Sequence, residues 1–158
     1  MKEFQGCPGS RMIDFGKEDA PIGTSGARVS SQLRQWPVQL HLVSPTAPYF
    51  QGADVLLAAD CVPFAMGNFH EDFLKGKALA IACPKLDAGQ DVYVEKIKAM
   101  FDEAKINTLT VLIMQVPCCH GLAGLAAQAL EESGRKVPVR TVVTSLTGEV
   151  LQEEWLES

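Results

Sequence analysis

The fold is decided by residues 109–133, LTVLIMQVPCCHGLAGLAAQALEES. Their first part, Leu109–Val116, is an apolar run interrupted only by Thr110 and Gln115, which is typical of a β-strand covered on both faces. A Pro-Cys-Cys-His turn follows, and Gly121–Ser133 then has the apolar spacing of a helix that ends before Gly134. The apolar face of this helix comprises Leu122, Ala126, Ala129 and Leu130. A buried strand followed by an amphipathic helix is one unit of an α/β fold.

The same alternation extends over the rest of the chain. Further strands are predicted at Val38–Val43, Val55–Ala59, Leu79–Ala82 and Val139–Val143. Further helices are predicted at Gly67–Lys75, with Asn68 as N-cap and Gly76 as the stop, and at Gln90–Ala104. Repeated strand–helix–strand units favour right-handed crossovers and a mainly parallel sheet. We therefore expect a three-layer α/β sandwich, with a sheet of about five strands and helices on both faces.

The chain of 158 residues is long enough for one domain of ordinary size. Residues 1–35 are expected to be an extended N-terminal arm, because the segment Gly16–Ser31 is rich in Gly, Ser, Pro and charge and has no sustained period. Residues 36–158 are expected to form a single α/β domain.

The charge balance excludes some partners. With 14 Lys and Arg against 19 Asp and Glu the net charge is −5, which argues against nucleic-acid binding and against an anionic membrane surface. No apolar run approaches the length of a membrane span, and the first residues lack a signal-peptide core. A cytoplasmic location with reduced thiols is expected.

The five cysteines carry the strongest chemical signal. Cys61, Cys83 and the pair Cys118–Cys119 each follow a predicted strand, with a proline beside them or one residue away. If the strands are parallel, all four thiols lie at the carboxyl edge of the sheet, where open α/β sheets bind ligands. Cys7 stands apart in a Cys-Pro-Gly turn of the arm, either as a free thiol or as an extra ligand.

Four thiolates suit a tetrahedral zinc ion or an iron–sulfur cluster. We therefore predict a metal or cofactor site formed by Cys61, Cys83, Cys118 and Cys119. His120 is a candidate ligand or proton carrier, and equally a polar residue of the helix's first turn. Buried, inert thiols are the structural alternative.

Four more polar residues are candidates for a role beside the thiols. His70 has a solvated helix start as its simpler interpretation, and His41 a structural role. Lys85 is either solvated or a counter-charge that lowers a thiolate pKa. Asp60, directly before Cys61, is a candidate to hydrogen-bond its loop or to orient a histidine.

Several sequence blocks together resemble one protein family. They are GCPGS (6–10), SQLRQWPVQL (31–40), APYF (47–50), AADCVPFA (58–65), FHEDFLKGK (69–77), CPKLD (83–87) and VPCCHGL (116–122). These blocks resemble the ferredoxin-type 4Fe-4S iron–sulfur binding proteins of anaerobic bacteria and archaea, in the region after their ferredoxin segment. The resemblance covers nearly the whole chain.

That resemblance implies a role in anaerobic redox metabolism beside a ferredoxin or redox enzyme. This chain departs from the family, because it has no C-x2-C-x2-C-x3-C run of the ferredoxin kind. Any cluster must therefore use Cys61, Cys83, Cys118 and Cys119, with Cys7 as a further candidate. The resemblance supplies no mechanism for this downstream domain.

Four functions are consistent with these features. The first is a metal-thiolate domain holding a 4Fe-4S cluster, for electron transfer or redox sensing. The second is the same site filled by zinc. The third is a thiol enzyme for sulfur transfer or disulfide exchange, with Cys118 or Cys119 as nucleophile. The fourth is a docking module with buried cysteines. The chain has no G-x-G-x-x-G after its first strand, no P-loop and no G-x-S-x-G.

Overall fold

The computed structural model describes residues 11–16 and 28–156, and these contain a five-stranded sheet in the order β4-β3-β5-β6-β7. The strands are β3 (Asp54–Ala59), β4 (Ala78–Ala82), β5 (Thr108–Met114), β6 (Val139–Thr144) and β7 (Val150–Leu156). The first four are parallel, and β7 is antiparallel to β6 at one edge. The predicted three-layer α/β sandwich is confirmed.

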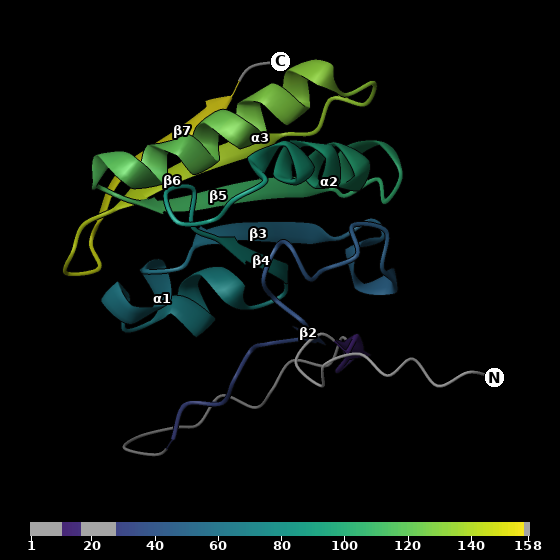
Figure 1. The fold of residues 1–158 in the computed structure, drawn as a ribbon. Coiled ribbons are helices and arrows are strands. Elements are labelled where there is room, and N and C mark those ends of the chain that lie inside the picture. The colour runs from purple at the N-terminus through teal and green to yellow at the C-terminus, as the bar shows by residue number, and fades with distance from the viewer. Residues whose placement is uncertain (1–10, 17–27, 157–158) are drawn as a thin grey trace.

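Helices cover the sheet on both faces (Figure 1). Two long helices, α2 (Gln90–Asp102) and α3 (His120–Glu132), lie side by side on one face. The short helix α1 (Val62–Ala65) and the π-helix η3 (His70–Leu74) form the connection between β3 and β4. Figure 1 places α1 across the sheet from α2 and α3. Two short 3-10 helices, η2 (Pro48–Phe50) and η4 (Pro117–Cys119), complete the helical elements of the described residues.

The core explains why the central strands read as continuous apolar runs. Every residue of β3 and β5 except the first is buried, as a strand covered on both faces requires. Large side chains from the helices and turns, including Tyr93, Phe101 and Phe50, are fully buried against them.

A separate two-stranded ribbon precedes the sheet. Its strands, β1 (Ile13–Asp14) and β2 (Gln35–Trp36), pair antiparallel, with Ile13 opposite Trp36. Most of the expected arm, including Cys7, lies outside the described residues. In the described part of the chain, no helix is long and apolar enough to cross a membrane.

The predicted strand Val38–Val43 is wrong. Only Gln39 makes a bridge, parallel to Ile81 of β4, and the backbone N–H groups of Leu42 and Val43 then turn back to the Gln39 carbonyl. The ammonium group of Lys96 donates hydrogen bonds to the carbonyl oxygens of Leu40, His41 and Val43 at 2.8–2.9 Å. In a strand, these carbonyls would accept hydrogen bonds from a neighbouring strand. The chain therefore forms a capped turn here.

Two other local predictions need correction. The segment Gly67–Lys75 contains the π-helix η3 in place of a regular helix, and Asn68 is not its N-cap but accepts a bond from the Asp72 N–H through its backbone carbonyl. The strand β7 was not predicted at all. Its residues Val150–Glu154 are exposed, so the strand lacks the apolar pattern that marks the others.

Tyr49 of η2 provides a test of this packing. Its hydroxyl oxygen is buried and has no hydrogen-bond partner among the described residues. We expect Tyr49→Phe to raise the free energy of unfolding by about 1 kcal/mol at pH 7, because it removes a desolvated, unpaired group. Equilibrium urea denaturation of both proteins measures this difference. A lower unfolding midpoint for the variant at pH 7 would contradict the expectation.

The difference in unfolding free energy between Tyr49→Phe and the wild-type protein should also change with pH. Burial, and then the charge of Asp14, raise the pKa of Tyr49 above 10.0. Its contribution to stability is therefore complete below the pKa of the unfolded tyrosine and is lost as the pH rises through the folded value. The advantage of Tyr49→Phe should widen between pH 7 and roughly pH 10.5. A constant difference across this range would contradict the raised pKa.

Candidate functional site

The predicted thiol positions meet at the carboxyl edge of the parallel strands. Cys61 follows β3 and Cys83 follows β4, and Ala59 and Ala82 are register partners at the ends of these strands. The Asp60 N–H extends the pairing by donating to the Ala82 carbonyl at 3.2 Å. Two thiol-bearing turns therefore leave neighbouring strands at the same level.

The third turn carries Cys118 and Cys119. Strand β5 lies on the other side of β3 from β4 and is followed by η4, which contains both residues. The chain leaves β3 toward β4 in one direction and leaves β5 toward β6 in the other. This reversal makes the carboxyl ends of β3 and β5 the topological switch point of the sheet, which is where open α/β sheets bind ligands. Cys61 follows one of these two strands and the Cys118–Cys119 pair follows the other.

The Cys119 thiol is buried, whereas Cys61 and Cys118 are exposed, and all three are free. Burial is the largest influence on Cys119 and raises the pKa of its thiol. A hydrogen bond from the backbone of Met114 lowers that pKa, while the charge and side-chain hydrogen bond of Cys118 and the charge of Cys61 raise it. Cys118 and Cys61 therefore both lie within electrostatic range of the Cys119 thiol.

Cys83 is held by its own turn. Its sulfur accepts the Leu86 N–H at 3.4 Å, and its N–H donates to the Asp87 carboxylate at 2.9 Å. This turn also touches the start of α3, since a Cβ added at Gly121 would lie 3.2 Å from the Cβ of Pro84. Glycine at position 121 thus lets the Cys83 turn approach the turn of Cys118 and Cys119.

One carboxylate oxygen organises the Cys83 turn. Asp87 Oδ2 accepts the Cys83 N–H, the Gln39 side-chain amide at 3.1 Å and the Tyr93 hydroxyl. Burial, and then the hydrogen bond to Asp87, raise the pKa of Tyr93, so its hydroxyl remains a donor. No spacing pattern in the sequence predicts this network, because its members come from three separate segments.

Asp87→Ala tests how much this network stabilises the fold. We expect the free energy of unfolding to fall by about 2 kcal/mol, because three donors lose a charged acceptor in a half-buried site. Urea denaturation measures the change. As control, Asp72→Ala removes an exposed carboxylate for which a change within about 0.5 kcal/mol is expected. Equal effects of the two substitutions would contradict a structural role for Asp87.

Asp60, directly before Cys61, has a carboxylate oxygen without a partner in the described part of the chain. Its side chain is half-buried, and Oδ1 has no hydrogen-bond partner among the described residues. Burial, and then the charge of Asp87, raise the pKa of this carboxyl group. Asp60 thus neither orients a histidine through Oδ1 nor closes its own loop with that atom, and it leaves a free acceptor at the edge.

The histidines and Lys85 have separate places. His120 is exposed as the first residue of α3, beside the thiol pair. His70 Nδ1 accepts the Gln32 N–H at 3.0 Å, and His41 Nε2 lies 2.6 Å from the Ala88 carbonyl oxygen, so both link loops. Lys85 is exposed at the Cys83 turn. Within residues 11–16 and 28–156, no three His, Cys, Asp or Glu side chains are already grouped to hold a metal ion.

Comparison with known proteins gives the following matches. The Rossmann-like domain family matches residues 47–157, a range that includes the whole five-stranded sheet and the four thiols of the carboxyl edge. An uncharacterized protein of Archaeoglobus fulgidus is 33% identical over 119 residues, which is 75% of this chain and 83% of that protein. No solved structure matches the chain.

Proposed function

Since this chain belongs to the Rossmann-like domain family, whose matched region contains the thiol-lined edge, we propose that this edge binds a metal centre through cysteine thiolates. The first candidate is a 4Fe-4S cluster that takes part in electron transfer or redox sensing. The observation that carries the proposal is the approach of Cys61, Cys118 and Cys119 from two adjacent strand ends, with Cys83 on the third. The resemblance to ferredoxin-type iron–sulfur proteins favours iron.

The donor set fits such a centre in its chemistry. Four thiolates are ligands for both zinc and iron–sulfur clusters. Thiolates held close together repel one another, and a cation between them removes that repulsion. Because the side chains are not yet grouped around one point, binding requires the exposed Cys61 and Cys118 to change rotamer, a change that exposed side chains make readily.

The surrounding residues hold the thiols for this role. The Leu86 N–H donates to the Cys83 sulfur, and backbone donors of this kind stabilise a thiolate and tune the potential of a bound cluster. Asp87 fixes the turn that carries Cys83. A bound cluster would supply one-electron transfer, and its partner in that exchange would be a ferredoxin or another redox enzyme.

Anaerobic reconstitution of the full chain with ferrous iron and sulfide tests the proposal. We expect about four iron and four sulfide per chain and an electron paramagnetic resonance signal after reduction with dithionite. Zinc bound in place of iron under these conditions would keep the thiolate site but overturn the redox role. Protein that stays colourless and free of both metals would overturn the site itself.

A thiol enzyme is the second candidate, because Cys118 is exposed directly before the thirteen-residue helix α3. The partial positive charge of a helix N-terminus favours a thiolate. The raised pKa of Cys119 disfavours that residue as the nucleophile. Rapid alkylation of Cys118 alone by iodoacetamide near pH 7 would support this function, and a rate like that of a free peptide thiol would exclude it.

A further inference from the structure

A second site lies at the opposite, amino edge of the sheet. A cavity of about 220 Å³ opens where β3 begins at Asp54 and β4 begins at Ala78. Its other walls come from β1, from the residue before β2 and from η2, which contribute Asp14, Arg34 and Tyr49. The cavity is thus built by the described N-terminal ribbon together with the sheet, and none of its described lining residues carries a thiol.

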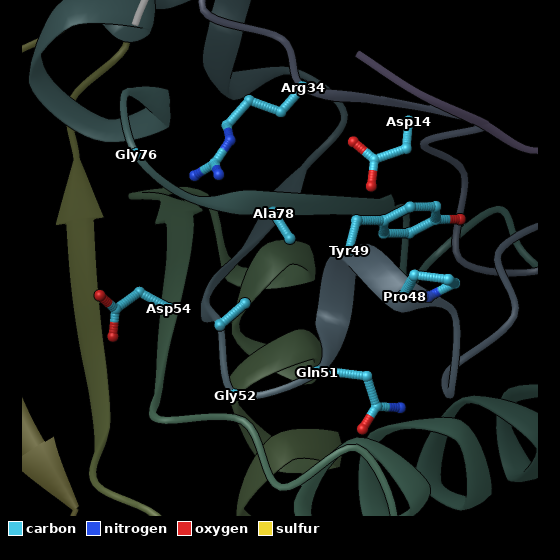
Figure 2. Close-up of a pocket in the computed structure, with 10 residues that line it drawn as sticks. Asp14, Arg34, Pro48, Tyr49, Gln51, Gly52, Asp54, Gly76 and Ala78 are labelled. Carbon is cyan, nitrogen blue, oxygen red and sulfur yellow. The ribbon is translucent and has the colours of Figure 1, made fainter. Parts of the chain in front are cut away.

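The cavity carries one cation that its surroundings leave unpaired. Figure 2 shows the Arg34 side chain reaching into the cavity from above. Arg34 is half-buried, and among the described residues its guanidinium group has no ion pair and no hydrogen bond. An arginine confined in this way presents a planar fork of N–H donors, the arrangement that recognises a carboxylate with two parallel bonds.

Two carboxylates line the same cavity, and each already accepts hydrogen bonds through its Oδ1 atom. Asp54 Oδ1 accepts the side chains of Asn107 at 2.7 Å and Thr108 at 2.8 Å. Asp14 Oδ1 accepts the Gly16 N–H at 2.8 Å, and Figure 2 shows Asp14 on the same upper side of the cavity as Arg34, with which it forms no ion pair. A positive and a negative group therefore face one space without neutralising each other.

An unpaired hydroxyl adds to the polar lining. The Tyr49 hydroxyl is buried and lacks a partner within the described ranges, and the charge of Asp14 is close enough to raise its pKa. Buried polar groups without a partner are rare in folded proteins and indicate an absent water, ion or ligand. The cavity thus offers a donor fork and a carboxylate to one small molecule, and the buried Tyr49 hydroxyl lies in its wall.

The size of the cavity limits that molecule. At roughly 30 Å³ for each water molecule, 220 Å³ holds about seven waters or a ligand of about ten non-hydrogen atoms. We propose that this cavity binds a small zwitterion of the α-amino acid class, with its carboxylate on Arg34 and its ammonium group on Asp14. The proposal is independent of the thiol edge, because the two sites share no residue.

Ligand-observed NMR titration of the full chain with each common L-amino acid tests this site. We expect at least one to bind with a Kd below about 1 mM, and its analogues lacking either the α-amino or the α-carboxylate group to bind at least about tenfold more weakly. No binding by any amino acid at about 10 mM would overturn the proposal. Equal binding of the analogue without the ammonium group would also overturn it, in favour of a simple anion site.

Substitutions locate the binding. Arg34→Gln and Asp14→Asn should each weaken the affinity of the best amino acid by about tenfold or more, since each removes one charge-assisted contact. The matched control is Arg28→Gln, which removes an exposed arginine that does not line the cavity and should leave the affinity unchanged. Unfolding midpoints of all three variants separate lost binding from lost structure. Unchanged affinity in well-folded Arg34→Gln would exclude this site.

Discussion

Replacing Gly148 by alanine is expected to lower the free energy of unfolding by about 3 kcal/mol, from two causes. Gly148 has a φ of +87°, and an alanine there adds about 1–2 kcal/mol of backbone strain. A Cβ at this position would also lie 2.4 Å from the Ala65 carbonyl oxygen, so either the hairpin or α1 must move. Forced overpacking of this kind typically adds 1–3 kcal/mol. Urea denaturation with an unchanged m value measures the sum.

Gly76→Ala separates the two causes. Gly76 has a similar φ of +77°, but among the described residues no heavy atom lies within 4 Å of a Cβ built there. Only the backbone strain applies, and the expected loss is about 1 kcal/mol. If Gly148→Ala and Gly76→Ala destabilise the protein equally, the close approach to Ala65 does not limit the fold.

The Gly148 contact also connects the C-terminal hairpin with the thiol edge. Gly148 lies in the turn between β6 and β7, and Ala65 is the last residue of α1. Helix α1 begins at Val62, immediately after Cys61. The hairpin therefore supports the short helix that follows the first thiol of the site. A substitution that displaces the hairpin should disturb Cys61 more than Cys83, whose turn is held by Asp87.

The parallel strands could be predicted from sequence because burial on both faces requires continuous apolar runs. The strand β7 could not be predicted in this way, because most of its side chains are exposed. Polar residues are therefore permitted at nearly every position of this edge strand. The sequence does contain a turn signal after strand β6, because Gly148 follows Thr147 there. The apolar run Val38–Val43 was misleading for the opposite reason, because its carbonyls are taken up by Lys96.

For the candidate site, the sequence predicts the positions of the cysteines along the strands better than the orientation of their side chains. Placement of Cys61, Cys83 and the Cys118–Cys119 pair at strand ends follows from strand boundaries alone. Which thiol is buried does not, because it depends on how η4 turns: Cys119 points inward and Cys118 outward. The Asp87 network and the amino-edge cavity join segments distant in the chain, and local patterns carry no information about such contacts.

Cys61→Ser and Cys119→Ser should each reduce the metal bound after anaerobic reconstitution to less than about a tenth of the wild-type amount. Even substitution of residues that only support metal ligands weakens affinity 10- to 100-fold, and loss of a ligand should have at least that effect. These two residues follow adjacent strands, β3 and β5, and the charge of Cys61 influences the Cys119 thiol. Iron and sulfide analysis of each reconstituted variant measures the loss.

The control for this series is Cys7→Ser, which also removes one thiol but changes a residue outside the described part of the chain. We expect this variant to retain its metal. Cys61→Ser should unfold at a urea concentration similar to that of the wild-type protein because Cys61 is exposed, whereas Cys119→Ser should unfold at a lower one because it puts a hydroxyl in a buried position. Full metal content in Cys61→Ser would show that Cys61, and with it the end of β3, is not part of the metal site. If Cys7→Ser loses its metal while Cys83→Ser keeps it, the fourth ligand comes from the N-terminal arm, and the turn held by Asp87 has a structural role only.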